Sequence, residues 1–315
     1  DWSVTGVQTC ALPIYAEGRI YVAEEFGHRI SVFNADGTYA TSIGQQGNLS
    51  EDSLALFNRP NSLTIGVDGR ILVADTWNYR IQEITSDGQQ ILSWGQPGEF
   101  GFGAPALPTD SFWGPRDVKV GNDGRIYVSD TGNKRIRVYT IENGGAVYQF
   151  DIATGGSAPG ELNEPSGIAL HPDGRIFIAD TWNRRVAVFA SNGAFLNNIA
   201  VRAWYEEKGN RPYLAIDAEH DLLYVTDPDG GRVLIYDTEG NCLGSFGQPI
   251  GDLSQGVQFN TVGGIAVDGQ GTVYIADAGA GVVYRFARPY NQVQDSIEIP
   301  GAESTEESTA ETTAE

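Results

Sequence analysis

Short runs of hydrophobic residues that alternate with polar ones recur along the chain, each bounded by Gly, Asp, Asn or Pro. The best-kept run reads G-R-I-x-V-A-D and is followed five residues later by an arginine, as in residues 69–75 with Arg80. Another alternating run comes before it, and a turn such as residues 172–174 joins two such runs into a hairpin. Period-two alternation with turns of this kind indicates short antiparallel strands.

The pattern occurs six times at a spacing of about fifty residues, and a fixed repeat of this length decides the architecture. Each copy carries a first strand, the G-R-I-x-V strand, a third strand after T-x-N-x-R and a shorter fourth strand. Six such units predict an all-β fold, a six-bladed β-propeller of four-stranded antiparallel blades. No stretch keeps a helical period, which excludes a helical solenoid of similar repeat length.

Residues 77–81, 132–136 and 182–186 each place an asparagine and then an arginine directly after a predicted strand. Together with the A-D or S-D that precedes them, these segments resemble the NHL repeat, and the resemblance extends from about residue 15 to about residue 290. It implies a six-bladed propeller. Some similar propellers bind single-stranded RNA through a basic surface, and the similar peptide-amidating lyases depend on an axial metal cluster.

The chain divides into three parts by composition. Most of residues 1–14 resembles a translated sequencing adapter and is interpreted as an artefactual segment, although Leu12 and Ile14 keep the register of an innermost strand. Residues 15–293 are predicted to form the propeller. Residues 294–315 predict a disordered acidic Ser/Thr/Glu tail or linker, because they can bury too little apolar surface to offset their ordering entropy. We therefore expect a part of a larger, truncated protein.

The net charge of the chain is −21 at pH 7. Phosphate binding needs Lys and Arg concentrated on one face, so this charge argues against nucleic acid as a partner. No apolar run is long enough to cross a bilayer, and we expect no membrane contact by this segment. Apart from Cys10 in the suspected artefact, Cys242 is the only cysteine, which gives neither a disulfide framework nor a thiolate metal site. The propeller is expected to be monomeric.

The aspartate that ends the second strand and the arginine five residues later recur from copy to copy. A catalytic group is needed once, whereas a group present in most blades is architectural. The pairs predicted to be structural are Asp75 with Arg80, Asp130 with Arg135, Asp180 with Arg185, and Asp227 with Arg232. The first copy has Glu24 in place of the aspartate, and the last has Val282 in place of the arginine.

The three histidines are separated by the predicted topology. His171 and His220 fall in turns between first and second strands, whereas His28 falls in a second-to-third-strand loop on the opposite face. Histidines on two faces cannot converge on one ion, so the sequence predicts no metal site, no cofactor and no catalytic residue. The chain is accordingly predicted not to be an enzyme.

One face of the predicted ring is rich in aromatic residues and arginines, because the second-to-third-strand loops and the inter-blade loops open there. These residue types dominate recognition surfaces. The residues predicted to bind a ligand are Trp77, Asn78, Trp113, Arg116, Trp182, Asn183, Arg211 and Tyr213. In contrast, Phe57, Phe112 and Phe259, each shortly before a blade begins, are interpreted as wedges between blades.

The main functional prediction is a non-catalytic binding or scaffold propeller that recognises a protein, peptide or glycan ligand through this face. The alternative is a lyase or hydrolase with an axial pocket that acts on a peptide, sugar or lactone. First-strand residues that approach the axis are the candidates for such a pocket, namely Asn61, Arg116, Asp117 and Tyr213. Two or more carboxylates or histidines converging in an axial cavity would contradict the scaffold hypothesis.

Overall fold

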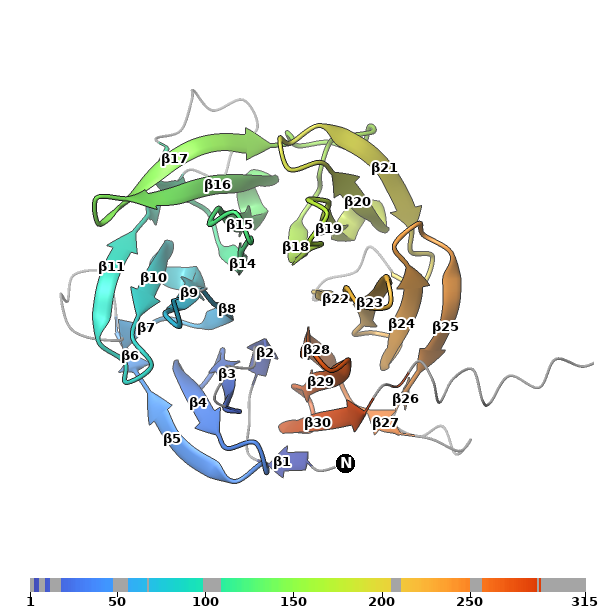
Figure 1. Cartoon of the computed structure of the whole chain (residues 1–315), viewed down its shortest axis with the longest axis horizontal. Coiled ribbons are helices and arrows are strands. Elements are labelled where there is room, and N and C mark those ends of the chain that lie inside the picture. Colours follow the sequence, from blue (N-terminus) through green and yellow to red (C-terminus); the bar gives the residue numbers. More distant parts are fainter. Residues whose placement is uncertain are drawn as a thin grey trace, which may run out of the picture.

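The chain forms a closed ring of six blades around a central axis, and each blade is a four-stranded antiparallel sheet (Figure 1). The computed structural model describes residues 3–5, 9–11, 18–47, 56–66, 68–98, 109–204, 211–249, 257–287 and 289. The predicted all-β six-bladed propeller is confirmed. The expected acidic tail, residues 294–315, lies outside the described residues.

The blades are numbered in chain order. Blade one consists of β2 (Thr9–Ala11), β3 (Ile20–Glu24), β4 (Arg29–Phe33) and β5 (Tyr39–Ile43). Blade two consists of β8 (Pro60–Ile65), β9 (Ile71–Asp75), β10 (Arg80–Ile84) and β11 (Gln90–Trp94). Blade three consists of β14 (Pro115–Val120), β15 (Ile126–Asp130), β16 (Arg135–Glu142) and β17 (Gly145–Ile152). Blade four consists of β18 (Pro165–Leu170), β19 (Ile176–Asp180), β20 (Arg185–Phe189) and β21 (Phe195–Ala200).

Blade five consists of β22 (Leu214–Asp217), β23 (Leu222–Asp227), β24 (Arg232–Asp237) and β25 (Cys242–Phe246). Blade six consists of β28 (Val262–Val267), β29 (Thr272–Asp277), β30 (Val282–Ala287) and β1 (Ser3–Thr5). Three short parallel pairs lie between blades: β6 (Gln45–Gln46) with β7 (Leu56–Phe57), β12 (Gln96–Pro97) with β13 (Ser111–Phe112), and β26 (Gln248–Pro249) with β27 (Gln258–Phe259). The 3₁₀ turns are η1 (Thr76–Asn78), η2 (Thr131–Asn133) and η3 (Thr181–Asn183).

The first strand of the chain closes the ring. Strand β1 pairs antiparallel with β30, with Ser3 opposite Tyr284, so that blade six is completed by a strand from the other end of the sequence. Strand β2 pairs with β3 and is the innermost strand of blade one. The residues expected in that strand, Leu12 and Ile14, lie outside the described residues.

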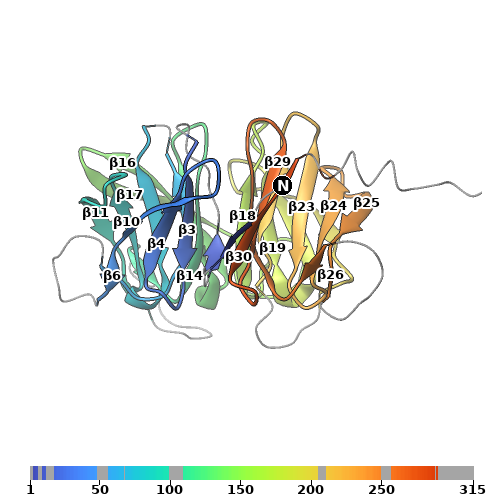
Figure 2. The ribbon, with the colours of Figure 1, turned by 90° about the horizontal axis from the view of Figure 1, so that it is seen from below.

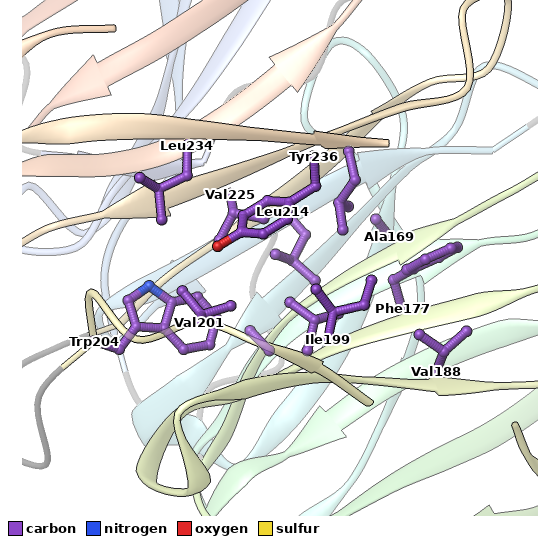
Figure 3. Packing of buried hydrophobic residues seen from close by; sticks show 13 residues of the cluster. Ala169, Phe177, Val188, Ile199, Val201, Trp204, Leu214, Val225, Leu234 and Tyr236 are labelled. Carbon is purple, nitrogen blue, oxygen red and sulfur yellow. The ribbon is translucent and has the colours of Figure 1, made fainter. Parts of the chain in front are cut away.

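Hydrophobic packing between neighbouring blades forms the core. The second strand of every blade is buried along its whole length, because its two faces contact the blades on either side. Figure 3 shows the cluster between blades four and five, where Trp204 is fully buried among Ile199, Val201 and Val225. The indole N–H of Trp204 donates to the carbonyl of Thr226 at 3.0 Å, which satisfies its one polar atom.

Three phenylalanines at the starts of blades are fully buried, as their interpretation as wedges requires. Phe57, Phe112 and Phe259 lie in the short strands β7, β13 and β27 and belong to three different inter-blade clusters. None of them is available to a ligand on the surface of the ring.

The ring has two distinct faces, seen edge-on in Figure 2. We call upper the face that carries the inter-blade connections and the loops between second and third strands, including η1, η2 and η3. The turns between first and second strands lie on the lower face. In the described part of the chain, no helix has the length and apolar character needed to cross a membrane.

Candidate functional site

A buried carboxylate near the upper face recurs from blade to blade. Asp180 is completely buried and accepts a hydrogen bond from Nε of Arg185 at 2.7 Å. The equivalent distances are 2.8 Å for Asp75 with Arg80, 2.9 Å for Asp130 with Arg135 and 2.9 Å for Asp227 with Arg232. In blade one Nε of Arg29 donates to Glu24 at 3.0 Å. Repetition in five blades gives these pairs a structural role.

The same carboxylate also holds the start of its own blade. Oδ1 of Asp180 accepts the backbone N–H of Asn163, seventeen residues earlier, at 2.6 Å. Asp75 accepts the N–H of Asn58 at 2.7 Å and Asp130 accepts that of Trp113 at 2.8 Å. Asp277, which has no arginine partner in the sequence, accepts the N–H groups of Asn260, Thr261 and Ala280. Each aspartate therefore fixes the backbone that enters the innermost strand.

Two residues predicted to bind ligand belong to this structural unit. The side-chain amide of Asn78 donates to Asp75 at 2.8 Å and to the carbonyl of Gly47 at 3.1 Å, and Asn78 is buried. The amide of Asn183 donates to Asp180 at 2.8 Å and to the carbonyl of Gly156 at 2.9 Å. Because their donors are engaged in these bonds, the two asparagines position the backbone of the blade.

The residue after the fixed N–H has a left-handed backbone in blades two, three and four. Its φ is 53° at Arg59, 63° at Gly114 and 53° at Glu164. A side chain in this conformation costs about 1–2 kcal/mol, which only glycine avoids. Arg59 and Glu164 are therefore strained, whereas Gly114 has the same backbone conformation without strain. Strain of this kind is typical of functional positions.

Tyr213 extends across the axis of the ring. It precedes β22 of blade five, which faces β8 of blade two across the centre (Figure 1). Its hydroxyl lies 3.4 Å from the carbonyl oxygen and from Oδ1 of Asn61, and 3.5 Å from the carbonyl of Arg116. The residue is 2% exposed. Tyr213 thus contacts residues of blades two and three and closes the axis.

A glycine makes this reach possible. A Cβ atom at Gly167 would lie 2.7 Å from the Cα of Tyr213 and 2.9 Å from the carbonyl oxygen of Pro212, closer than real Cβ contacts. The N–H of Gly167 donates to that carbonyl at 3.1 Å. The absence of a side chain at Gly167 therefore lets the start of blade five approach blade four.

Charged side chains from several blades meet on the upper side of Tyr213. Nη1 of Arg211 lies 3.1 Å from Oε2 of Glu25, a buried carboxylate in the second-to-third-strand loop of blade one. Nη1 of Arg59 lies 4.0 Å from the other oxygen of Glu25. Arg116 interacts electrostatically with Arg211, Tyr213, Glu164 and Glu25. We call the set Glu25, Arg59, Arg116, Glu164, Arg211 and Tyr213 the axial cluster.

The two partly buried groups at the centre of this cluster have shifted pKa values. Burial raises the pKa of Glu164, and the positive charges of Arg116, Lys134 and Arg211 only partly oppose that shift. Burial, followed by the charge of Arg211, lowers the pKa of Arg116. A carboxyl group with a raised pKa beside guanidinium groups is a candidate for proton transfer.

The donor set of the axial cluster does not fit a metal ion. Its two carboxylates are accompanied by three guanidinium groups, which repel a cation. Among the residues that the structure describes, no group of three or more His, Cys, Asp and Glu side chains could hold a metal. His28 accepts the N–H of Arg59, while His171 and His220 pair with aspartates on the lower face.

Aromatic side chains from the predicted ligand-binding set lie on the upper face. Trp77 is 37% exposed and Trp182 is 44% exposed. The ring of Tyr79 contacts both Trp77, at 6.2 Å between centroids, and Trp113, at 5.4 Å. Phe26 packs beneath the guanidinium of Arg59 at 4.9 Å. These rings offer apolar surface on the face that bears the axial cluster.

Below Tyr213 a cavity of about 290 Å³ follows the axis, lined mainly by aliphatic side chains of the innermost strands. Asp117, a sequence candidate for the axial pocket, does not line this cavity; it is fully buried and accepts bonds from Ser62 at 2.5 Å and from the N–H of Ile168 at 2.7 Å. Nζ of Lys119 also donates to it at 2.9 Å. Asp117 therefore links blades two, three and four, which is a structural role.

The structure brings together Arg116, Arg211 and Tyr213, which the sequence had selected for a ligand-binding face. It adds Glu25, Arg59 and Glu164, which were not selected. A signal for two of these is present in the sequence, because a charged residue precedes a proline at or shortly before the innermost strand in Arg59-Pro60, Glu164-Pro165 and Arg211-Pro212.

Two family models match the chain. The model described as NHL repeat matches residues 57–84, which span the first three strands of blade two. Blade two thus matches an NHL repeat, within a chain that folds as a six-bladed propeller. The model described as SMP-30/Gluconolactonase/LRE-like region matches residues 106–255, from blade three to blade five. No sequence among the curated proteins matches the chain.

Solved structures with a similar fold include enzymes. Virginiamycin B lyase from Staphylococcus aureus with quinupristin is 18% identical, with a match that covers 89% of the present chain and 80% of the lyase chain and a TM-score of 0.58. A gluconolactonase from Xanthomonas campestris is 16% identical, with coverages of 90% and 86% and a TM-score of 0.62. Regucalcin from Agrobacterium tumefaciens, a calcium-binding protein, is 13% identical, with coverages of 90% and 90% and a TM-score of 0.58. At these identities the likeness establishes the fold alone.

The comparisons correct the functional prediction. A gluconolactonase-like region model covers blades three to five, and similar propellers include a lyase and a gluconolactonase. The prediction of a non-catalytic scaffold that is not an enzyme is therefore wrong, and the findings favour the alternative of a lyase or hydrolase. The sequence prediction rested on the absence of a histidine or metal-ligand cluster, and it did not include Glu25, Arg59 and Glu164, which join Arg116 and Arg211 in the axial cluster.

Proposed function

We propose that this six-bladed propeller is a hydrolase or lyase whose axial cluster acts on a lactone, sugar or peptide. The observation that carries the proposal is the position of the gluconolactonase-like match. Residues 106–255 include Arg116, Glu164, Arg211 and Tyr213, four of the six members of the axial cluster. The matching region thus contains most of the axial cluster.

Glu164 is proposed as the general acid and base. Burial raises its pKa, and it lies beside the guanidinium groups of Arg116 and Arg211. In hydrolysis, Glu164 takes a proton from water while the water oxygen attacks the carbonyl carbon. It then returns the proton to the oxygen that leaves when the C–O bond breaks. In elimination, Glu164 removes a proton from the carbon beside the carbonyl, and the C–O bond at the next carbon breaks without uptake of water.

The arginines are proposed to stabilise the negative charge that develops on oxygen in either reaction. Fixed cationic donors in a partly buried site are effective because they need no reorganisation during the reaction. Arg116 and Arg211 both act electrostatically on Glu164. Glu25, which lies 3.1 Å from Arg211, is a positioning residue that holds this guanidinium at the axis.

Tryptophans of the upper face, two exposed and one partly buried, are proposed to bind the part of the substrate that extends from the axis. Trp77, Trp113 and Trp182 present rigid apolar rings at low entropic cost. They lie on the face through which a substrate reaches the axial cluster from above. Asn78 and Asn183 contribute indirectly, through the backbone that they hold.

The test is turnover of a panel of aldonolactones, cyclic esters and ester-linked peptides by the purified chain. Hydrolysis incorporates ¹⁸O from labelled water, whereas elimination gives an unsaturated product without the label. Glu164→Gln should abolish turnover. Glu142→Gln, at an exposed position in the β16–β17 hairpin, is the matched control and should keep full activity. Equal activity of Glu164→Gln and the parent protein would refute the role of the axial cluster.

A further inference from the structure

We propose that the substrate carries a carboxylate group, which Arg116 binds in the axial cluster. The inference rests on the proposed function, because it concerns the same site. It adds a class of substrate, a singly charged anion with planar geometry, that the fold and the family matches do not specify.

The first argument compares the interaction partners of the three arginines. Arg211 and Arg59 both lie near Glu25, at 3.1 and 4.0 Å, and Arg59 also packs on Phe26. Within the described part of the chain, by contrast, the guanidinium of Arg116 has no hydrogen-bond acceptor. A guanidinium carries five N–H donors. Arg116 therefore retains its full donor capacity for a ligand.

The second argument is the balance of charge. The cluster contains three guanidinium groups, of Arg59, Arg116 and Arg211, and two carboxyl groups, of Glu25 and Glu164. With both carboxyl groups ionised, the cluster has an excess of one positive charge. Lys134 adds positive potential at Glu164 from outside the cluster. A bound monoanion would neutralise the excess charge of the cluster.

The third argument is burial. Arg116 is partly buried, and its neighbour Arg211 makes the charged form more costly, as the direction of its pKa shift indicates. Removing a guanidinium from water without a partner is unfavourable, and an anion in hydrogen-bonding contact offsets this cost. Binding an anion at Arg116 is thus favoured by the burial of its guanidinium and by the neighbouring charge of Arg211.

The choice of a carboxylate over a phosphate follows from geometry and from neighbouring charge. The planar fork of an arginine matches a planar carboxylate through two parallel hydrogen bonds. Glu25 and Glu164 lie close by, and their negative charges repel a dianion more strongly than a monoanion. The cluster therefore suits a carboxylate better than a doubly charged phosphate.

The experiment measures binding without turnover. Calorimetry compares acetate, benzoate and D-glucuronate with the matching neutral acetamide, benzamide and D-glucuronamide, and with inorganic phosphate. At least one carboxylate should bind more tightly than its amide. Because hydrogen bonds to charged groups contribute about 1.5–3 kcal/mol, Arg116→Gln should weaken carboxylate binding by about ten- to hundredfold.

Two further variants complete the test. Arg116→Lys keeps the charge and removes the planar fork, so it should bind carboxylates with an affinity between those of the parent protein and Arg116→Gln. Arg19→Gln removes an exposed arginine from the lower face and should leave binding unchanged. Thermal melting of each variant establishes that the ring is folded.

Several results would overturn the inference. They are equal affinity for a carboxylate and its amide, tighter binding of phosphate, no binding of any probe, or unchanged carboxylate binding by Arg116→Gln. A failure of the proposed function is distinguishable, because the chain would then bind carboxylates and show no turnover of the substrate panel.

Discussion

The carboxylate of Asp180 accepts the backbone N–H of Asn163 at 2.6 Å, directly before the strained residue Glu164. The same carboxylate accepts a bond from Arg185 at 2.7 Å. A pair that recurs around the ring for structural reasons therefore sets the backbone from which a candidate catalytic group projects. We therefore expect the side chain of Asp180 to affect both the stability of the ring and the proposed activity.

Asp180→Asn should destabilise the ring and weaken activity together. The substitution leaves the guanidinium of Arg185 without its carboxylate, and breaking a buried ion pair costs about 3–5 kcal/mol. Chemical denaturation measures the loss, and kcat/KM below the melting range measures the effect on Glu164. Glu142→Gln, at an exposed site, serves as control. Unchanged stability of Asp180→Asn would show that the pair does not support the junction.

Glu164→Gly should abolish activity without lowering stability. Glycine adopts a φ of 53° without strain, so the free energy of unfolding should stay equal or rise by up to about 1–2 kcal/mol. Turnover should nevertheless be lost, because the carboxyl group is gone. Thermal melting and kcat are the two measurements. A large fall in stability would mean that the side chain of Glu164 is held for packing and not for chemistry.

The pH dependence of stability should report the ionisation of Glu164. Burial raises its pKa above the ordinary 4.5, so the fold favours the protonated form. The stabilisation is fully present below the unfolded pKa and is lost as the pH rises through the folded pKa. The free energy of unfolding of the parent protein minus that of Glu164→Gln should therefore fall as the pH rises from 4.5 and then level off. A difference that grows with pH would contradict a raised pKa.

Substitutions of Tyr213 should distinguish its hydroxyl from its ring. The hydroxyl contacts at 3.4 to 3.5 Å are long, so Tyr213→Phe should change stability by less than about 1 kcal/mol. Tyr213→Ala removes the ring that closes the axis and should cost about 3–5 kcal/mol. Urea unfolding of the two variants gives both values. Similar losses for both would place the stabilisation in the hydroxyl.

Tryptophan substitutions test the aromatic part of the upper face. Trp77→Ala and Trp182→Ala should raise KM with little change in stability, because these rings are 37% and 44% exposed. Trp204→Ala is the matched control, since Trp204 is fully buried and should lose about 3–5 kcal/mol on truncation. Unchanged KM in both exposed variants would exclude these two rings from substrate binding.

The ring was predictable from the sequence because each blade repeats a local pattern. Runs such as residues 174–180 specify strands without reference to the rest of the chain, and their number gives the number of blades. The axial cluster was not predictable in this way, because Glu25 and Arg211 are 186 residues apart and meet only when the ring closes. Their contact depends on the geometry of the closed ring, which a local sequence pattern does not predict.

The contrast between Asn183 and Glu164 illustrates the same limit. Asn183 stands in the most recognisable part of the repeat, yet its amide is used for Asp180 and Gly156. Glu164 occupies a position held by Arg59 in one blade and Gly114 in another, so repetition did not mark it. This position, which varies among copies at a constant backbone conformation, supplies two of the six residues of the axial cluster, Arg59 and Glu164.

The left-handed residue that follows the fixed N–H in blades two, three and four also suggests a way in which such a ring can change its substrate during evolution. Because Asp75, Asp130 and Asp180 hold the junctions in place, the next residue can be exchanged in one blade without disturbing its neighbours. Arginine, glycine and glutamate already occupy that position in three successive blades. New specificities can therefore arise by single substitutions, with the architecture inherited intact.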